Sequence, residues 1–267
     1  MFQARDYVRP STLEEAYQLC QKRRNVVIGG MMWLKMENAS KQSIIDLSAL
    51  GLDQIEEKEE EFQIGCMATL RMLETHEGLN REFDGIFREC TRHIVGVQFR
   101  NGATVGGSVY GRFGFSDILT CLLALDAEVE LYKGGRMKLS EFAAKPLSVN
   151  DRDILVRLYV KKDGRRASYH TMRQTKTDFP VLAVCVAETK EGWQVSVGAR
   201  PQRAKAVELK KEEGISAAEL AAKAAGCFTY GTNLRATADY RAYLAEVIIR
   251  RLMEKQMENR ASQEESR

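Results

Sequence analysis

The apolar positions of the chain fall in short runs that alternate with segments of helical spacing. Such runs are typical of short buried strands, whereas apolar positions repeated every three or four residues indicate amphipathic helices. Ser11 and Glu14 have the spacing of a capping box, so we expect the first helix to begin at Ser11. Strands are predicted over residues 26–28, 44–47, 62–66, 128–132, 136–140 and 154–160, with an exposed acidic turn over 53–61 and a short helix after residue 66. This mixture of hairpins and helices predicts an α+β fold rather than a regular parallel βαβ series.

A second region begins near residue 165. Residues 181–187 and 193–197 predict a hairpin, and Ser216 with Glu219 forms another capping box that opens a helix. The last helix is expected from about Asp239, with one apolar face made of Tyr240, Tyr243, Val247, Ile248 and Leu252. The end of the chain is almost wholly polar, which indicates a frayed or disordered tail.

Composition narrows the possible functions. The 267 residues include 40 basic and 37 acidic side chains, a net charge of +3 that gives no electrostatic case for binding nucleic acid. No apolar run has the length of a membrane span, and the first ten residues, MFQARDYVRP, lack the apolar core of a signal peptide, so we expect a cytoplasmic protein that does not enter a membrane. The six cysteines form no CxxC pair and the three histidines are scattered, which predicts no metal site and no catalytic triad in this chain.

Two glycine pairs are the candidates for a phosphate-binding site. Gly29-Gly30 follows a predicted strand, and Gly106-Gly107 lies in the glycine-rich stretch 98–117, which cannot be one regular helix or strand. Backbone N–H groups in such turns can form a concave anion site, and two of them could hold the two phosphates of a dinucleotide. Either pair alone fits a tight turn equally well. Neither has the spacing of a P-loop or of the Rossmann fingerprint.

A longer ordered set of segments gives these glycines a context. The set comprises VVIGGMMWLKM, SIIDLSAL, FQIGCMATLRMLE, QFRNGATVGGSVYGRFGFSDILTCLLALDAEVEL, DILVRLYV, RQTKTDFPVLAVCVA, VSVGARPQRA and ATADYRAYLAEVIIRRL. In this order it resembles the FAD-binding medium subunit of the molybdenum hydroxylases, the family of xanthine dehydrogenase and carbon monoxide dehydrogenase. The resemblance covers nearly the whole chain, and RNGATVGGS followed by SD is its most specific element.

The resemblance implies a fold and an assembly. Two non-Rossmann, PCMH-type subdomains, residues 1–55 and 56–164, would bind FAD. A C-terminal α/β domain, residues 165–258, like that of the CO dehydrogenase flavoprotein, would close over the cofactor before a polar tail, residues 259–267. A molybdopterin-binding large subunit and a small subunit with [2Fe–2S] clusters would be the partners. Electrons would pass from those clusters through FAD to NAD or another acceptor.

The resemblance also places FAD contacts on two loops. In the first loop the family has AGGTDL, so that Met31 and Met32 replace a hydroxyl and a carboxyl side chain, while backbone contacts would survive. In the second loop Ser108 stands where asparagine is usual. The implied contact residues are Ile28, Gly29, Gly30, Met31, Met32, Trp33 and Leu34 in the first loop, and Thr104, Val105, Gly106, Gly107 and Ser108 in the second.

Three further contacts are implied. Asp117 matches the aspartate on the ribose side of the cofactor, although Ser116-Asp117 is also an ordinary helix cap and both roles can hold together. Leu155 matches a residue near the adenine, and by its pattern alone belongs to a strand core. His170 stands where relatives have a lysine near the flavin, and is otherwise a partly exposed strand histidine. Phe113, on the loop before Asp117, could reach the flavin or the iron–sulfur partner.

Two other functions stay open at this point. A scaffold subunit of the same complex that has lost FAD would explain the two methionines of the first loop. A free-standing flavin oxidoreductase would need its own substrate pocket. In the main interpretation no side chain acts as base or nucleophile, because the flavin carries out the redox chemistry and the protein positions it. The substrate cannot be inferred, since in this family the molybdenum subunit selects it.

Overall fold

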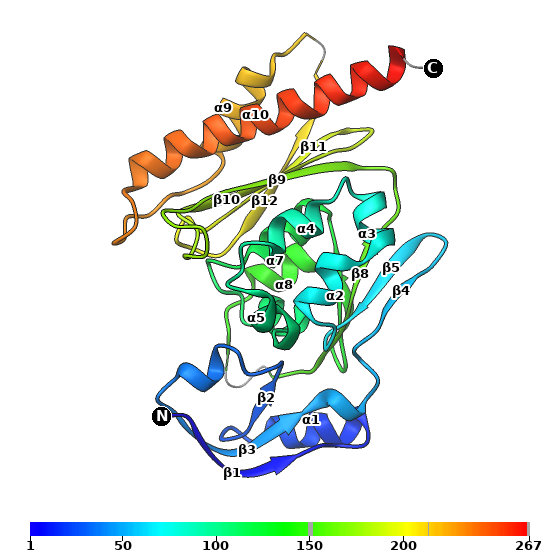
Figure 1. Ribbon diagram of the computed structural model, residues 1–267, viewed down its shortest axis with the longest axis vertical. Helices are drawn as coiled ribbons and strands as arrows, with labels where there is room; N and C mark the ends of the chain where they lie inside the picture. Colours follow the sequence, from blue (N-terminus) through cyan, green and yellow to red (C-terminus); the bar gives the residue numbers. More distant parts are fainter. Residues whose placement is uncertain (149–151, 213, 266–267) are drawn as a thin grey trace.

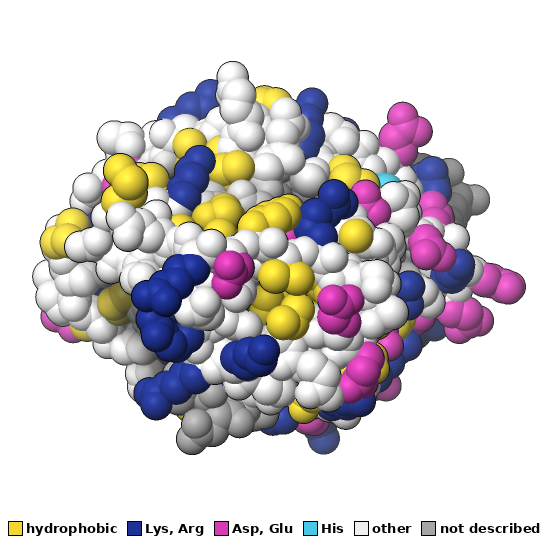
Figure 2. Space-filling model, turned by 90° about the horizontal axis from the view of Figure 1, so that it is seen from below, with side chains coloured by type: hydrophobic (Ala, Val, Ile, Leu, Met, Phe, Trp, Pro, Cys, Tyr) yellow, Lys and Arg dark blue, Asp and Glu magenta, His cyan; other side chains and the backbone are white. Residues whose placement is uncertain are grey.

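The first sheet lies at one end of the molecule (Figure 1). The computed structural model describes residues 1–148, 152–212 and 214–265. The strands β1 (Gln3–Val8), β2 (Val26–Ile28) and β3 (Ser40–Asp46) form a parallel sheet in the order β1-β3-β2. Ile45 of the central strand is fully buried, because it pairs with a neighbour on each side and packs into the core with Ala16 and Cys20 of α1 (Leu13–Gln21). Strand β1 is exposed along most of its length, and Figure 2 shows this end from below, with hydrophobic side chains gathered near the middle.

The second sheet is antiparallel and has the strand order β4-β5-β8-β6-β7. Its strands are β4 (Ile55–Glu57), β5 (Glu61–Gly65), β6 (Glu128–Leu131), β7 (Gly135–Lys138) and β8 (Leu155–Lys161). The helices of this part are α2 (Leu70–Thr75), α3 (Glu77–Glu82), α4 (Ile86–Thr91), α5 (Val97–Gly102), α6 (Val105–Tyr110), α7 (Asp117–Ala124) and α8 (Leu139–Ala144). Helix α7 is apolar on all sides and every one of its residues is buried, because it lies between this part and the third sheet.

The third sheet is antiparallel and has helices on both faces (Figure 1). Its strands, in the order β12-β11-β10-β9, are β9 (Arg166–Met172), β10 (Leu182–Glu188), β11 (Gly192–Gly198) and β12 (Lys205–Lys210). The helices α9 (Ala217–Gly226) and α10 (Ala238–Glu265) cover its outer face. Side chains alternate along β10, so Cys185 packs into the core with α7 whereas Val184 and Val186 pack with α9 and α10.

Several expectations from the sequence are confirmed. The fold is mixed α and β, the hairpin of residues 128–138 is present, and β10 pairs with β11 as predicted. Ser116 caps α7 by accepting a hydrogen bond from Leu119 N at 3.1 Å, and Ser216 and Glu219 form the reciprocal capping box of α9. The glycine-rich stretch contains two six-residue helices, α5 and α6, and then a loop, so it is not one regular element. Two short 3-10 helices, Leu34–Met36 and Leu47–Ala49, follow β2 and β3.

Other expectations were wrong at particular residues. The cap of α1 is Thr12, not Ser11: Thr12 Oγ1 accepts from Glu15 N at 3.1 Å, while Glu15 accepts from Ser11 N at 2.8 Å. The predicted box of Ser11 and Glu14 is therefore absent, because Thr12 is the cap and the Glu15 carboxylate binds the N–H of the residue before it, Ser11. The acidic segment 53–61 contains the edge strand β4 rather than only a turn, since charged side chains are tolerated where one strand edge faces water.

The C-terminal helix also differs from the expectation. Tyr240 and Tyr243 are 43% and 66% exposed, and the buried face carries Arg241 instead, whose guanidinium donates to Val181 O at 2.9 Å and to Ala236 O at 2.8 Å. Helix α10 continues through residues 259–265, where a tail was expected, and residues 266–267 lie outside the described residues. Among the described helices, none is long and apolar enough to cross a membrane.

Candidate cofactor-binding site

A cavity of about 420 Å³ is lined by residues from all three parts of the molecule. The loop after β2 and the start of α6 both reach it, as do the start of β8 and the segment after β9. Cavities of this size are typical of sites for small molecules and cofactors. The two glycine pairs, separated by more than seventy residues in the sequence, therefore meet at one place.

The first glycine loop presents unused hydrogen-bond donors. Gly30 has φ +81° and Met31 has φ +59°, so two successive residues are in the left-handed region. A Cβ atom on Gly30 would lie 1.7 Å from Gly102 O, which leaves room only for glycine. Among the described residues, no acceptor pairs with the backbone N–H groups from Gly30 to Trp33. Successive free N–H groups at a cavity form a site that suits an anion such as a pyrophosphate.

The second glycine loop has no such unused donors in the first turn of α6. Its N–H groups already bind acceptors within the protein at 2.8–3.1 Å. These bonds run from Val105 to Ala68 O, from Gly106 to Cys66 O, from Gly107 to Thr104 Oγ1 and from Ser108 to Thr104 O. The expectation of two equivalent anion sites is therefore wrong, because short hairpin-like contacts with the segment before α2 satisfy the second loop internally.

The second loop instead holds the first loop in position. Thr104 Oγ1 donates to Gly29 O at 3.1 Å and accepts from Gly107 N, so one hydroxyl joins both glycine pairs. A Cβ atom on Gly29 would lie 2.4 Å from Thr104 Oγ1, and one on Gly106 would lie 2.6 Å from Cys66 O. Both positions require glycine, because an added methyl group would collide with the Thr104 hydroxyl at Gly29 and with the backbone of Cys66 at Gly106.

Aromatic side chains form another wall of the cavity. The ring of Trp33 lies 5.2, 5.7 and 5.3 Å from the rings of Phe99, Phe115 and Phe179, measured between centroids. Phe115 and Phe179 are 4.4 Å apart, and Phe113 stacks on Phe115 at 5.1 Å. Rings at these separations pack favourably and offer flat apolar surface for a planar ligand.

Asp117 and Arg173 form a buried ion pair at the same cavity. Asp117 Oδ1 accepts from Arg173 Nη2 at 2.7 Å and also from the hydroxyl of Tyr169. Burial raises the pKa of the Asp117 carboxyl, and the opposing effects of Arg173 and Tyr169 do not cancel that rise. Arg173 Nη1 donates to Asp178 O, whereas Nε has no acceptor among the described residues.

His93 is a second cavity residue with an unused donor. Its Nε2 accepts from Arg92 Nε at 3.0 Å, which places the proton of the neutral ring on Nδ1. That Nδ1 is buried and has no partner among the described residues. Burial first, and then the positive charges of Arg92 and Arg173, lower the pKa of His93, so the ring stays neutral at physiological pH.

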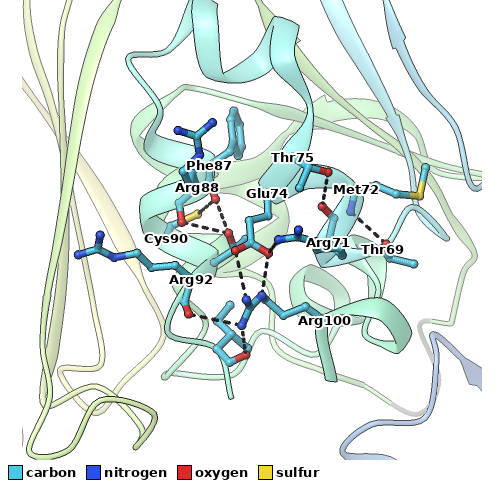
Figure 3. A network of polar contacts seen from close by, with 12 residues as sticks. Thr69, Arg71, Met72, Glu74, Thr75, Phe87, Arg88, Cys90, Arg92 and Arg100 are labelled. Atoms are coloured by element: carbon cyan, nitrogen blue, oxygen red, sulfur yellow. Dashed lines mark hydrogen bonds and ion pairs between the residues drawn. The ribbon is translucent and has the colours of Figure 1, made fainter. Parts of the chain in front are cut away.

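The segment that carries His93 is held from behind by a closed polar network (Figure 3). Arg100 donates through Nε and Nη2 to both carboxylate oxygens of Glu74, at 2.8 and 3.2 Å, and through Nη1 to Arg92 O and Ile94 O. Arg71 adds a third bond to Glu74 at 2.9 Å. Burial alone would raise the pKa of Glu74, but the hydrogen bonds and charges of the two arginines outweigh it and lower the pKa. This gives Arg100 a structural role.

The structure gathers most of the residues expected to contact the cofactor. Of the expected residues, those that line the cavity are Ile28, Gly29, Met31, Met32, Trp33, Leu34, Thr104, Gly106, Gly107, Ser108, Asp117 and Leu155. Gly30 and fully buried Val105 are not among the lining residues, although each lies in the chain between two residues that are. Met31 and Met32 contribute backbone donors, so the exchange of their side chains does not remove the anion site.

His170 is not at this cavity. Alternation along β9 directs Tyr169 to Asp117 and therefore turns His170 to the opposite face of the sheet. There it lines a separate cavity of about 430 Å³ between β9, α4 and α10. The expectation that His170 joins the other site residues is thus corrected.

Sequence reasoning did not single out Arg173, His93 and Tyr169 as site residues. Their importance depends on contacts between distant segments, such as the 56 residues that separate Arg173 from Asp117. The segment RQTKTDFP entered the resemblance, but nothing in its pattern distinguished Arg173 from neighbouring polar residues.

Comparison with solved structures places this fold in a known class. One chain of quinoline 2-oxidoreductase from Pseudomonas putida 86 matches with a TM-score of 0.81 and 20% identity, covering 96% of this chain and 97% of its own. A chain of carbon monoxide dehydrogenase from Hydrogenophaga pseudoflava matches with a TM-score of 0.80 and 19% identity, over 93% and 96%. A chain of Cu,Mo-CO dehydrogenase in a cyanide-inactivated form matches with a TM-score of 0.83 and 20% identity, over 95% and 98%. At these identities the likeness shows the fold.

The family follows from the sequence. Residues 1–160, more than half of the chain, match the family described as the FAD binding domain in molybdopterin dehydrogenase, and the chain belongs to this family. The uncharacterized protein YgfM of Escherichia coli K12 is 23% identical over 248 residues, which are 91% of this chain and 93% of YgfM.

FAD is the cofactor of this chain, and the residues present fit it. The free N–H groups of the first loop suit the pyrophosphate, and the aromatic wall suits a planar ring. The cavity has the size of a cofactor site. The chain is thus an FAD-binding component of an oxidoreductase family.

Proposed function

We propose that this chain is the electron-transfer subunit of a multi-subunit, xanthine dehydrogenase-like molybdopterin-dependent dehydrogenase. Electrons would arrive from [2Fe–2S] clusters of a small partner subunit and leave to NAD or another acceptor. A large partner subunit would carry molybdopterin and oxidise the substrate. The observation that carries the proposal is the joint cavity of the two glycine loops, in a chain whose family is defined by FAD binding.

The residues of this chain would bind and orient the cofactor. The backbone donors of Gly30 to Trp33 would hold the pyrophosphate, and Thr104 would keep that loop in place. Bound FAD supplies the redox chemistry, so no side chain of this chain has to act as base or nucleophile. We assign FAD binding to residues 1–55 and 56–164, and the closing of the site to residues 165–258, because the three sheets fall in these successive parts.

The rim of the cavity supports a partner at its mouth. Trp33, Val95 and Phe113 line the cavity and are still 38%, 44% and 40% exposed. Exposed apolar side chains that lie together around a cofactor site mark an interaction surface. We propose that the iron–sulfur subunit docks on this rim, which would bring its clusters next to the cofactor. One similar solved structure, the CO dehydrogenase of Hydrogenophaga pseudoflava, is named with a molybdenum cofactor, which supports a molybdenum-containing partner.

Affinity purification of the tagged chain from its own organism tests the proposal. We expect stoichiometric FAD, iron and molybdenum in the purified complex. Val95→Asp, on the same rim but outside the aromatic wall, should release the iron and molybdenum while FAD stays bound, because a charge in an apolar interface is costly. The matched control is Tyr243→Asp, an exposed aromatic on α10 that does not line the cavity, which should keep the complex intact.

Two outcomes would contradict the proposal. A tagged chain that carries FAD, lacks metal-containing partners and oxidises a substrate alone would be a free-standing flavin oxidoreductase. A complex that contains iron and molybdenum but no flavin would make this chain a scaffold. A cytoplasmic location belongs to the same proposal, and it fits the six cysteines, which are all free.

A further inference from the structure

The wall around Arg173 is the part of the cavity whose hydrogen bonding is incomplete. The side chain of Arg173 is only 7% exposed, yet its Nε has no acceptor among the described residues. The same holds for Nδ1 of His93, and both side chains line the cavity. A buried donor without a partner costs about 1–3 kcal/mol, so two of them at one cavity indicate a ligand that brings acceptors.

Arg173 is also held in a fixed position. Asp117 and the carbonyl of Asp178 bind its two terminal nitrogens, and Tyr169 in turn holds Asp117. Because these contacts come from α7, β9 and the segment after β9, the guanidinium cannot leave the cavity wall without breaking a buried ion pair.

The neighbours of Arg173 select the kind of ligand group. The carboxylate of Asp117 would repel a phosphate, and the free backbone donors of the first loop already suit that group. Phe115 and Phe179 provide flat apolar surface at the same cavity. Together these features suit a planar heteroaromatic ring with nitrogen and oxygen acceptors along one edge.

We propose that Arg173 and His93 hold the polar edge of the flavin ring, and that the Arg173 charge raises the reduction potential of the bound flavin. This rests on the proposed role of the flavin as the redox centre of the chain. Reduction adds negative charge to the ring, and a fixed cation beside it favours that state in a site of low dielectric constant. Asp117 acts as a positioning residue for Arg173.

Variants of the FAD-loaded chain test this by redox titration against reference dyes and by FAD titration. Arg173→Met should shift the equilibrium between oxidised and reduced flavin about tenfold toward oxidised, or about 30 mV for a two-electron couple. Arg173→Lys retains the charge, so it should keep most of the potential but bind FAD more weakly. His93→Phe should weaken FAD binding about two- to tenfold, and His93→Gln should restore part of it.

Arg165 provides the matched control. Its buried side chain also forms an ion pair with an aspartate, Asp163, but it does not line the cavity. Arg165→Met should leave the flavin potential and FAD affinity unchanged. Circular dichroism of each variant shows whether it is folded, and Arg173→Lys keeps a partner for Asp117 if Arg173→Met does not fold.

Two results would overturn the proposal. One is a folded Arg173→Met variant with unchanged potential and FAD affinity. The other is an unchanged potential with weakened binding of AMP, which would place the adenine at this wall. Both measurements use the chain with FAD alone, so they do not depend on whether the partner subunits or NAD are as proposed.

Discussion

Two buried arginine–carboxylate pairs in this protein look alike but differ in how completely they are satisfied. In the pair of Arg100 and Glu74, every nitrogen of the guanidinium donates to a carboxylate or a carbonyl oxygen. In the pair of Arg173 and Asp117, one nitrogen is left without an acceptor among the described residues. The pKa values of the two carboxylates are also shifted in opposite directions: that of Glu74 is lowered and that of Asp117 is raised.

This difference distinguishes a pair that supports the fold from a pair that lines a binding site. The pair of Arg100 and Glu74 closes on itself and ties the segment around Ile94 to α2. The pair of Arg173 and Asp117 borders the cavity and keeps hydrogen-bonding capacity for a ligand. Buried polar groups are normally satisfied, so an incomplete network next to a cavity is informative where a complete one is not.

Breaking the closed pair should have the largest effect on stability. Arg100→Met leaves Glu74 buried with only Arg71 beside it, and we expect a loss of about 3–5 kcal/mol in the free energy of unfolding. Arg173→Met in the apo-protein should cost less, because the Asp117 carboxyl can take up a proton. Urea denaturation measures both. Equal losses would show that the two pairs have the same structural role.

Filling the first glycine loop should also be costly. Gly30→Ala places a Cβ against Gly102 O and forces a left-handed conformation, which costs about 1–2 kcal/mol for the backbone and about 1–3 kcal/mol for overpacking. FAD affinity should fall with it. Gly51→Ala is the control: its φ is +65° but no atom lies within 4 Å of the added Cβ, so only the backbone term applies. If the two variants lost the same stability, the close approach of Gly102 O would not explain why residue 30 is glycine.

On acidification, Glu74 and Asp117 should change the free energy of unfolding in opposite directions. Because the pKa of Glu74 is lowered, its contribution is complete above the pKa of an unfolded glutamate, about 4.3, and is lost as the pH falls through its folded-state value. Because the pKa of Asp117 is raised, the cost of its charge is present at neutral pH and disappears as the pH falls through its folded-state value.

Unfolding free energies from about pH 7 down to about pH 2 test these signs, because the Glu74 contribution is lost only below about pH 4.3. Glu74→Gln should lose less stability on acidification than the unchanged protein, and Asp117→Asn should lose more. Parallel curves for all three proteins would contradict the assigned pKa directions.

The smallest effect is expected at the exposed arm of the closed network. The side chain of Arg71 is 41% exposed, and surface ion pairs contribute about 0–1 kcal/mol. Arg71→Met should therefore change the unfolding free energy by less than about 1 kcal/mol. A loss as large as that of Arg100→Met would mean that Arg71 neutralises Glu74 as much as Arg100 does.

Local patterns in the sequence predicted much of the fold. The capping residues Ser116 and Ser216, the hairpin of β6 and β7, and the glycine loops depend on neighbours in the chain, so their patterns suffice. Strands β1 and β12 were not predicted, because their polar residues gave no clear alternation, and β1 pairs with β3, which lies far away in sequence.

The sequence predicted most of the residues that form the site, but not which of them keep free hydrogen-bond donors for a ligand. The sequence indicated two equivalent glycine loops, whereas only the first keeps free donors. The reason is the contact of Val105 and Gly106 with the segment before α2, which no local pattern reveals. Likewise His170 could be aligned with a family position, but the face of β9 on which it lies depends on the packing of Tyr169 against Asp117.

Amide hydrogen exchange with and without FAD tests whether the first glycine loop binds the cofactor. We expect the amides of residues 30–33 to exchange rapidly in the apo-protein and to become protected when FAD binds. The amides of residues 105–108, already bonded within the protein, should be protected in both states. Protection by FAD confined to residues 105–108, with none at residues 30–33, would contradict the account.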